Sequence, residues 1–249
     1  EASQAAKDTL AAMDWLKEHG AERYYIKYCS TFDSTPKGNI GPDIDAAIEA
    51  FDIPYTLLCP SLPVNKRIVK NGVLIVDGKP IAEGHMAHHP LNPMWASKLP
   101  ELMSEQGKYS CLVLGEQEMA KSEEEIRSIV TAYAKEHTHF YIVPEYASDA
   151  DGQKIADIFG HEKLLTGGSG LLEFLAAGIA EEYNCCDADA SGNRVNGRGI
   201  ALSGSCSTAT CEQCKTYSAE NPAIAVYPER LLTGEQTVEQ IWKEIEDHP

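Results

Sequence analysis

The stretch RYYIKYCSTFDSTPKGNIGPDIDAAIEAFDIPYTLLCP, residues 23–60, contains the pattern that decides the fold. It begins with a run rich in tyrosine and ends with the apolar run YTLLCP, and both runs are typical of β-strands. Between them lies a helical pattern that has Pro42 in its first turn and apolar positions at Ile44, Ala47, Ile48 and Phe51. The order strand, loop, helix, strand predicts an α/β domain with a parallel sheet.

The chain on either side extends this pattern, with one interruption. Residues 3–18 show the spacing of an amphipathic helix, and Gly20 suits its C-cap. Residues 67–84 contain Asn71-Gly72 and Asp77-Gly78 between short β-prone runs, which predicts a small antiparallel hairpin excursion. The alternation then resumes, with strands expected at 110–116, 139–145 and 163–167 and helices at 122–136, 151–159 and 170–182.

A second α/β domain is expected to begin near the end of the sequence. Residues 1–180 are expected to form the first domain, and the polar residues 181–198 are interpreted as a linker. The stretch 199–218 has the pattern of a strand, a loop and a helix, and AIAVYP (223–228) with a helix at 236–246 continues it. Because two strands rarely form a stable sheet, we expect the second domain, 199–249, to be incomplete.

Composition and charge exclude several classes of function. The formal net charge of −17 argues against nucleic acid or an anionic membrane as partner, although a small anion can still bind near lysines and backbone amides. No run approaches the ~18 apolar residues of a membrane helix, and no leader is seen, so a cytoplasmic location is expected. The eight cysteines are then free thiols, although the spacing Cys206-x4-Cys211-x2-Cys214 weakly matches a zinc site.

The loop KYCSTFDSTPKGNIG, residues 27–41, carries an unusual number of polar side chains. Lys27 and Lys37 offer positive charge, Asp33 can accept a hydrogen bond from a ligand hydroxyl, and the hydroxyl groups belong to Ser30, Thr31, Ser34 and Thr35. The loop follows a strand and precedes a helix, where open α/β sheets place ligands. A small polyhydroxylated carboxylate fits this set, and a long turn held by its own side chains is the alternative.

Two glycine-containing turns are candidate anion sites. TGGSG, residues 166–170, places Gly167, Gly168 and Ser169 between a strand and a helix, where free amides can receive a phosphate or carboxylate. SGSCS repeats the arrangement with Ser203, Ser205 and Ser207. Neither turn is a Walker A loop or a full Gly-x-Gly-x-x-Gly motif, so each is equally consistent with a tight connection.

Two further patterns are weaker. LSGSCS lacks the second glycine of the Gly-x-Ser-x-Gly elbow, which argues against an esterase. EGHMAHHPLNPM, residues 83–94, contains three histidines without an acidic residue at ligand spacing, so we interpret it as a loop in which His89 faces substrate or is simply packed.

Five segments in their order along the chain resemble the four-carbon acid sugar kinase family. They are KYCSTFDSTPKGNIGP, CPSLPVNKRIVKNG, HPLNPM, LTGGSGL and SGSCSTAT, and the resemblance covers essentially the whole sequence. It implies ATP-dependent phosphorylation of a threonate- or erythronate-type acid, with ATP and Mg²⁺ as cofactors and possible homo-oligomers. It also implies that residues 1–180 bind the acid and that residues 199–249 begin the nucleotide-binding domain.

The resemblance implies roles for individual residues. The substrate-binding residues would be Lys27, Ser30, Asp33, Ser34, Lys37 and His89. The nucleotide-binding residues would be Gly167, Gly168, Ser169, Ser203, Ser205 and Ser207. No metal ligand is implied among the side chains.

This sequence departs from the family at several points. The Ile-Ala-Asp-Asp-like segment that would supply a catalytic aspartate is missing, as is the glycine-rich phosphate loop near the end, so the catalytic residue is unknown. Asn92 stands where the family commonly has threonine, which leaves the exact acid open. The alternative to an active kinase is a non-catalytic sugar-acid-binding fragment or a regulatory remnant.

Overall fold

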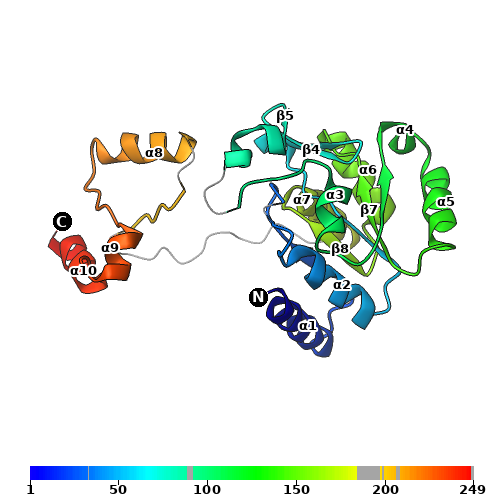
Figure 1. Cartoon of the computed structure of the whole chain (residues 1–249), viewed down its shortest axis with the longest axis horizontal. Coiled ribbons are helices and arrows are strands. Elements are labelled where there is room, and N and C mark those ends of the chain that lie inside the picture. The colour runs from blue at the N-terminus through cyan, green and yellow to red at the C-terminus, as the bar shows by residue number, and fades with distance from the viewer. Residues whose placement is uncertain (33, 89–91, 184–196, 198, 206–207, 248–249) are drawn as a thin grey trace. The chain divides into compact units, whose positions relative to one another are not determined.

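The computed structural model describes residues 1–32, 34–88, 92–183, 197, 199–205 and 208–247 (Figure 1). The chain divides into two compact units, Glu1–Ala188 and Asp189–Pro249. The predicted boundaries at 180 and 198 stay a prediction, because most residues between them lie outside the described ranges.

The first unit is built on a parallel sheet. Its strands are β1 Tyr24–Lys27, β2 Tyr55–Leu57, β6 Cys111–Leu114, β7 Phe140–Pro144 and β8 Leu164–Gly167. Strands β6, β7 and β2 pair in that order, and β8 pairs with β1. A parallel bridge between Cys59 and Gly167 joins the two groups, so the order across the sheet is β6, β7, β2, β8, β1. The predicted α/β class with a parallel sheet is confirmed.

Helices bury both faces of this sheet. Successive residues of a strand point to opposite faces of the sheet and therefore pack in different cores. Leu58 and Tyr141 pack with helices α1 Ala2–Glu18 and α2 Ile40–Ala50. Leu57 and Ile142 pack instead with helices α5 Glu123–Ala134, α6 Asp149–Phe159 and α7 Gly170–Glu182. Strands buried on both faces read as continuous apolar runs, which explains why YTLLCP and FYIVP lack an apolar–polar alternation.

The antiparallel excursion is also confirmed. Strands β3 Arg67–Lys70, β4 Val73–Val76 and β5 Lys79–Pro80 form a three-stranded meander. Asn71 and Gly72 have φ of 46° and 78°, and Asp77 and Gly78 have φ of 51° and 79°. Both pairs therefore adopt the left-handed backbone that two-residue hairpins require. Short helices complete the unit: η1 Pro63–Asn65, η2 Ile81–Glu83, η3 His85–His88, α3 Leu99–Ser104 and α4 Glu116–Met119.

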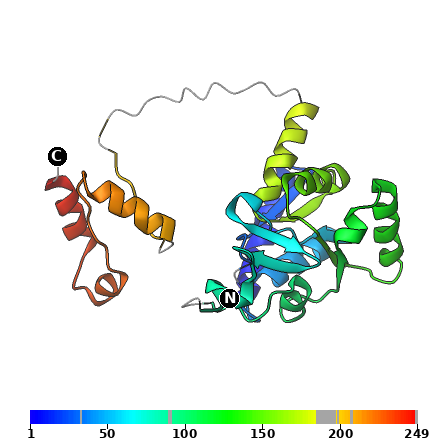
Figure 2. The ribbon, with the colours of Figure 1, turned by 90° about the horizontal axis from the view of Figure 1, so that it is seen from above.

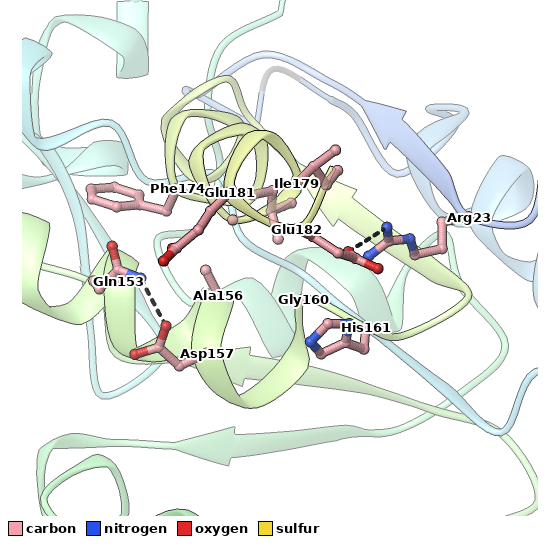
Figure 3. Close-up of a pocket in the computed structure, with 12 residues that line it drawn as sticks. Arg23, Gln153, Ala156, Asp157, Gly160, His161, Phe174, Ile179, Glu181 and Glu182 are labelled. Carbon is pink, nitrogen blue, oxygen red and sulfur yellow. Dashed lines mark hydrogen bonds and ion pairs between the residues drawn. The ribbon is translucent and has the colours of Figure 1, made fainter. Parts of the chain in front are cut away.

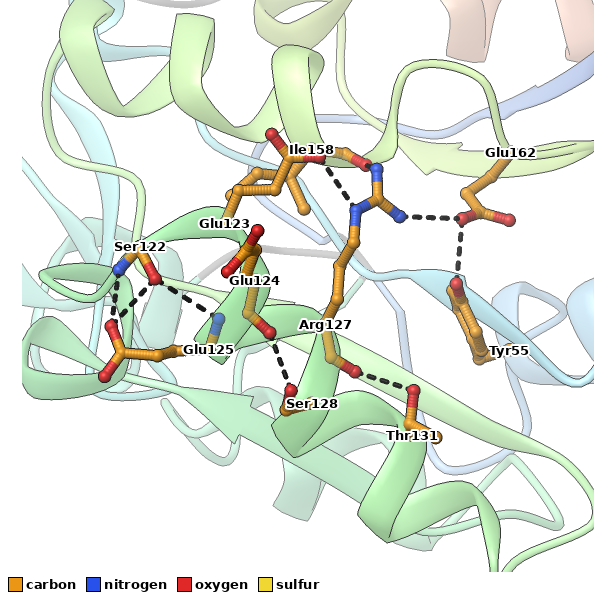
Figure 4. Close-up of polar contacts among 10 residues, drawn as sticks. All are labelled: Tyr55, Ser122, Glu123, Glu124, Glu125, Arg127, Ser128, Thr131, Ile158 and Glu162. Carbon is orange, nitrogen blue, oxygen red and sulfur yellow. Dashed lines mark hydrogen bonds and ion pairs between the residues drawn. The ribbon is translucent and has the colours of Figure 1, made fainter.

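Polar contacts fix helix α5 to its neighbours (Figure 4). Ser122 and Glu125 form a reciprocal capping box at its start. Arg127 pairs with Glu123 at 2.8 Å and donates to the carbonyl of Ile158 at the end of α6. The outer helices are thereby tied together around the second core.

The second unit contains helices and no strand among its described residues. Its helices are α8 Thr208–Ser218, α9 Pro228–Thr233 and α10 Val238–Asp247. The strands predicted within 199–203 and 223–228 are wrong, since 199–205 and 223–227 have no regular structure and Pro228 begins α9. A parallel strand needs a hydrogen-bonded neighbour, and neither segment has one in the described part of this unit. Among all helices of the described residues, none has the length and apolar character needed to cross a bilayer.

Candidate functional site

Three polar segments leave the same edge of the parallel sheet. They follow β1, β2 and β8 and contain residues 28–39, 59–62 and 167–170. Because parallel strands end at one edge, these segments lie at the carboxyl edge, where open α/β sheets bind their ligands. We therefore examine this edge as the candidate site.

Two aromatic residues anchor the first segment to the core. The Tyr28 hydroxyl accepts a hydrogen bond from the Cys59 amide at 3.1 Å and lies 3.3 Å from Thr166 Oγ1. Burial raises the pKa of Tyr28 above its ordinary value, so the ring stays neutral. Phe32 is fully buried with φ of 47° and meets the Tyr28 ring edge-on at 5.3 Å. The loop backbone is thus fixed at two points.

The serines of the loop are engaged by protein groups. Ser30 Oγ accepts a hydrogen bond from Arg67 Nη1 at 2.9 Å. Ser34 is buried, and its hydroxyl donates to Gln106 Oε1 at 3.2 Å, an oxygen that also receives the Gly41 amide at 3.0 Å. Ser34 therefore supports the loop, and only its remaining acceptor capacity is available to a ligand.

The charged residues predicted for this site have different environments. Lys27 and Lys37 are exposed, and neither has an ion-pair partner among the described residues. Asp33 and His89 lie outside the described residues. The two lysines can attract an anion, but nothing in the described part of the chain holds their ammonium groups in one position.

The glycine turn 167–170 packs against the segment that follows β2. A Cβ on Gly168 would lie 2.8 Å from the Pro60 carbonyl oxygen, and one on Gly170 would lie 2.3 Å from that of Ser61. The Gly168 amide donates to the Cys59 carbonyl at 2.9 Å, so it is not a free donor. Close backbone contact therefore explains these glycines, and the predicted bare amide at Gly168 is replaced by a bond within the fold.

This turn also approaches the loop after β1. The position of a Gly168 Cβ is 3.5 Å from Ser30 Cβ. Ser169 is exposed at the N-cap of α7 and makes no side-chain capping bond. The structure thus brings Ser30, Gly168 and Ser169 together at one edge, although the sequence patterns place them in different sites.

Two residues of this edge were missed by the sequence analysis. They are Arg67, the first residue of β3, and Ser61, which follows β2. Both lie within the segment CPSLPVNKRIVKNG, where neither a motif nor a spacing marks them. The only available signal was an arginine in a conspicuously polar stretch, which is too common to single out.

The second unit holds the remaining predicted nucleotide contacts. Ser203 and Ser205 are exposed, and Ser203 Oγ lies 3.3 Å from Cys214 Sγ. Ser207 lies outside the described residues. No three histidine, cysteine, aspartate or glutamate side chains of the described residues gather as a metal site. Cys206 of the weak zinc pattern lies outside the described residues, so that pattern is not tested. These serines are not placed relative to the first unit.

A surface groove of about 310 Å³ lies elsewhere, between α6 and α7 (Figure 3). Four of its polar side chains pair within it: Arg23 with Glu182 at 3.3 Å, and Gln153, which donates to Asp157 at 2.7 Å. None of the predicted site residues lines this groove. The carboxyl edge therefore remains the better candidate.

Comparisons with known proteins identify the family of this chain. A family model described as "sugar-binding N-terminal domain" matches residues 1–175. The chain is 39% identical over 235 residues to a 3-oxo-tetronate kinase of Escherichia coli K12, covering 93% of this chain and 59% of the relative. It is 36% identical over 231 residues to a 3-oxo-tetronate kinase of Brucella melitensis, covering 92% and 53%. The chain thus spans between about half and three-fifths of these relatives.

Solved structures give the same result. A Salmonella typhimurium LT2 protein described as a putative tRNA synthase superimposes with a TM-score of 0.80 at 36% identity, covering 99% of this chain and 57% of that one. A Bordetella bronchiseptica protein of unknown function, with bound citrate and a domain-swapped dimer, gives 0.59 at 27% identity, covering 73% and 42%. The parallel sheet and its loops are therefore shared with longer proteins.

Proposed function

Because this chain belongs to the sugar-binding N-terminal domain family, whose model matches residues 1–175, we propose that it is the acid-binding part of a kinase that phosphorylates a four-carbon sugar acid with ATP. The observation that carries the proposal is the polar carboxyl edge of the sheet, where Ser30 and Arg67 meet the turn at Gly168. The names of the relatives support the kinase and the size of the acid.

The substrate class follows from these names and from the chemistry of the edge. The relatives are named for 3-oxo-tetronate, so this acid is our first candidate, and threonate and erythronate share its carbon chain. All of them carry one carboxylate beside several oxygen groups, which suits cations surrounded by hydroxyl groups. The citrate bound by the Bordetella protein is also a small hydroxylated carboxylate.

We assign the residues as the sequence predicts, with one change. Lys27 and Lys37 attract the carboxylate, and Ser30, Asp33, Ser34 and His89 complete the acid site. Ser203, Ser205 and Ser207 belong to the nucleotide site. The turn of Gly167, Gly168 and Ser169 was expected to bind nucleotide, and its contact with Ser30 favours the acid instead.

The reaction proposed is a direct phosphoryl transfer. A hydroxyl oxygen of the acid bonds to the γ-phosphorus of ATP, the bond from that phosphorus to the β-phosphate oxygen breaks, and the hydroxyl proton passes to a base. No described residue is assigned as that base. Since no cluster of metal-binding side chains occurs among the described residues, no side chain of this chain is assigned to Mg²⁺.

The proposal is tested by ligand binding to the 249-residue chain. We expect 3-oxo-tetronate, threonate or erythronate to raise its melting temperature, because a ligand that binds only the folded state stabilises it. Butyrate, which has the carboxylate but no hydroxyl, should leave the melting temperature unchanged. If no four-carbon acid stabilises the chain, the proposal is wrong.

Substitution of Lys27 tests whether its side chain contributes to binding of the acid or of ATP. Lys27→Ala should weaken binding of the acid several-fold and leave ATP binding unchanged, as measured by calorimetry. Equal weakening of both would reject the role of Lys27. Incubation of the 249-residue chain with acid and MgATP detects kinase activity directly, because a phosphorylated acid indicates a kinase. Binding without product is expected of an acid-binding part as well as of a non-catalytic module, so a full-length relative assayed in the same way separates the two.

Location and assembly are part of the same proposal. A metabolic kinase of this class would act in the cytoplasm, and the domain-swapped dimer of the Bordetella protein suggests a homo-oligomer. Sedimentation of the 249-residue chain measures its oligomeric state directly.

A further inference from the structure

Arg67 lies at the carboxyl edge and forms no ion pair with a carboxylate of the described residues. Its backbone pairs with Leu62, donating to the Leu62 carbonyl at 3.2 Å and accepting from the Leu62 amide at 2.7 Å. Its Nη1 donates to Ser30 Oγ at 2.9 Å, while its Nε is buried and has no hydrogen-bond partner in the structure. The ion pairs of the described residues involve other cations, so the charge of Arg67 is not neutralised within the described chain.

A second donor close by in the sequence and the fold is also unpaired. Ser61 is fully buried, and its Oγ has no hydrogen-bond partner. Its neighbour Leu62 pairs with Arg67, and its own carbonyl touches the first residue of α7, Gly170. Ser30, which holds Arg67, lies against Gly168 of the same turn. These contacts, with Leu62 and Gly170 as intermediates, link four residues that we call the Arg67 cluster: Ser30, Ser61, Arg67 and Gly168.

Two unpaired donors in one cluster are costly unless something binds them. Leaving a buried polar group unsatisfied destabilises the folded state, and native proteins contain few such groups. An arginine with a buried Nε is suited to a planar anion, because its fork of N–H groups matches the two oxygens of a carboxylate. The uncapped start of α7 adds a favourable dipole for negative charge at the same edge.

We propose that Arg67 binds the carboxylate of the sugar acid, with Nε and a second guanidinium nitrogen as the donors and Ser61 Oγ as a further donor. Ser30 is then a positioning residue, because its oxygen holds the guanidinium in place. This inference rests on the proposed function and deepens it: Arg67 makes the direct contact, and the exposed Lys27 and Lys37 contribute longer-range attraction.

The test measures binding of carboxylate and neutral ligands to variants of the 249-residue chain. The probes are 3-oxo-tetronate and the stereoisomers of threonate and erythronate, together with the amide of whichever acid binds most tightly. Arg67→Gln should raise the Kd of the acid about 10- to 100-fold, as expected for losing charge-assisted hydrogen bonds, and should leave amide binding nearly unchanged. Arg67→Lys keeps the charge and loses the fork, so a loss of about tenfold is expected.

The matched control is Lys66→Gln. It removes one positive charge from the adjacent, exposed position, and the Kd should change less than about threefold. Ser30→Ala should weaken acid binding by an intermediate factor. The melting temperature of each variant without ligand shows whether it folds. If Arg67→Gln does not fold, the Kd of the acid for Arg67→Lys tests the role of Arg67 instead.

The outcomes separate the two proposals. If the wild-type chain binds an acid and folded Arg67→Gln binds it equally well, this inference is overturned while the proposed function stands. If Arg67→Gln loses acid and amide binding alike, the role is structural and the inference is again wrong. If Arg67→Gln weakens binding of inorganic phosphate or ATP rather than the acid, Arg67 belongs to the nucleotide. If wild type binds no acid, both proposals fail.

Discussion

At the scale of single residues, the carboxyl edge combines groups that the fold uses with groups that it leaves available. The Ser34 hydroxyl donates to Gln106, and the Gly168 amide donates to the Cys59 carbonyl. Arg67 Nε and Ser61 Oγ, in contrast, have no hydrogen-bond partner in the structure. The sequence showed that the 27–41 loop is polar, but not which polar atoms remain free. That depends on contacts such as Arg67 with Ser30, which join residues 37 positions apart.

A pH-dependent contribution to stability is expected from Asp43, in the first turn of α2. Burial, with a smaller contribution from Asp8, raises the pKa of Asp43 to about 6 from 3.8, and its Oδ1 is buried without a partner. A carboxyl group with a raised pKa favours folding while protonated, so its contribution is present below pH 4 and is lost as the pH rises to about 6. With a discount for its partial exposure, the loss is about 1 kcal/mol.

Asp43→Asn should remove this dependence. We expect the variant to gain stability relative to wild type between pH 4 and pH 7, as measured by urea unfolding at both values. Asp14→Asn, at an exposed position of α1, is the control and should show no such gain. A constant difference between Asp43→Asn and wild type at both pH values would contradict the prediction.

At the scale of helices and strands, the first unit was largely predictable. Strands buried on both faces appeared as apolar runs, and both hairpins were marked by Asn-Gly and Asp-Gly pairs. The order of strands was not predictable, since β8 enters between β2 and β1 through contacts more than 100 positions apart. In the second unit, apolar composition alone suggested strands that have no pairing partner in the described residues.

Two glycines of helix α7 should respond oppositely to alanine. A Cβ at Gly170 would lie 2.3 Å from the Ser61 carbonyl oxygen, whereas a Cβ at Gly178 meets nothing within 4 Å. Gly170→Ala should therefore destabilise the chain by about 2 kcal/mol or more, because the two backbones must separate. Gly178→Ala should stabilise it by about 0.5–1 kcal/mol through helix propensity. Figure 2 shows the last turns of α7 extending beyond the sheet.

Denaturant unfolding of both variants checks this pair. Both variants replace glycine by alanine in the same helix. Helix propensity alone would therefore change the free energy of unfolding in the same direction at both positions. Equal changes would show that the contact between Gly170 and Ser61 does not constrain the start of α7.

At the scale of the whole molecule, the apolar core lies in the first unit. Its buried residues form two clusters, one on each face of the sheet, whereas no described residue of the second unit is buried. Large apolar side chains of the second unit are exposed instead, including Leu202, Leu232 and Trp242. Burial of apolar surface is the main driving force of folding, so the first unit should determine the unfolding transition.

Removal of either end tests this distribution. A chain that ends at residue 183 should melt within about 2 °C of the 249-residue chain and bind less of a hydrophobic dye. Removal of residues 1–20 should lower the melting temperature by several degrees, because Met13 of α1 packs in the first core. The prediction is wrong if removal of residues 184–249 lowers the melting temperature as much as removal of residues 1–20.

The contact between the glycine turn and the segment after β2 has a consequence for selectivity. The main chain at Pro60 and Ser61 fills the space that side chains at Gly168 and Gly170 would need. The glycine turn and the segment after β2 are therefore in close contact without a ligand. A preorganised surface of this kind loses little conformational entropy on binding. Under the proposed function, discrimination between one four-carbon acid and another is set by how the oxygens of each acid match fixed positions, and stereoisomers should differ in dissociation rate more than in association rate.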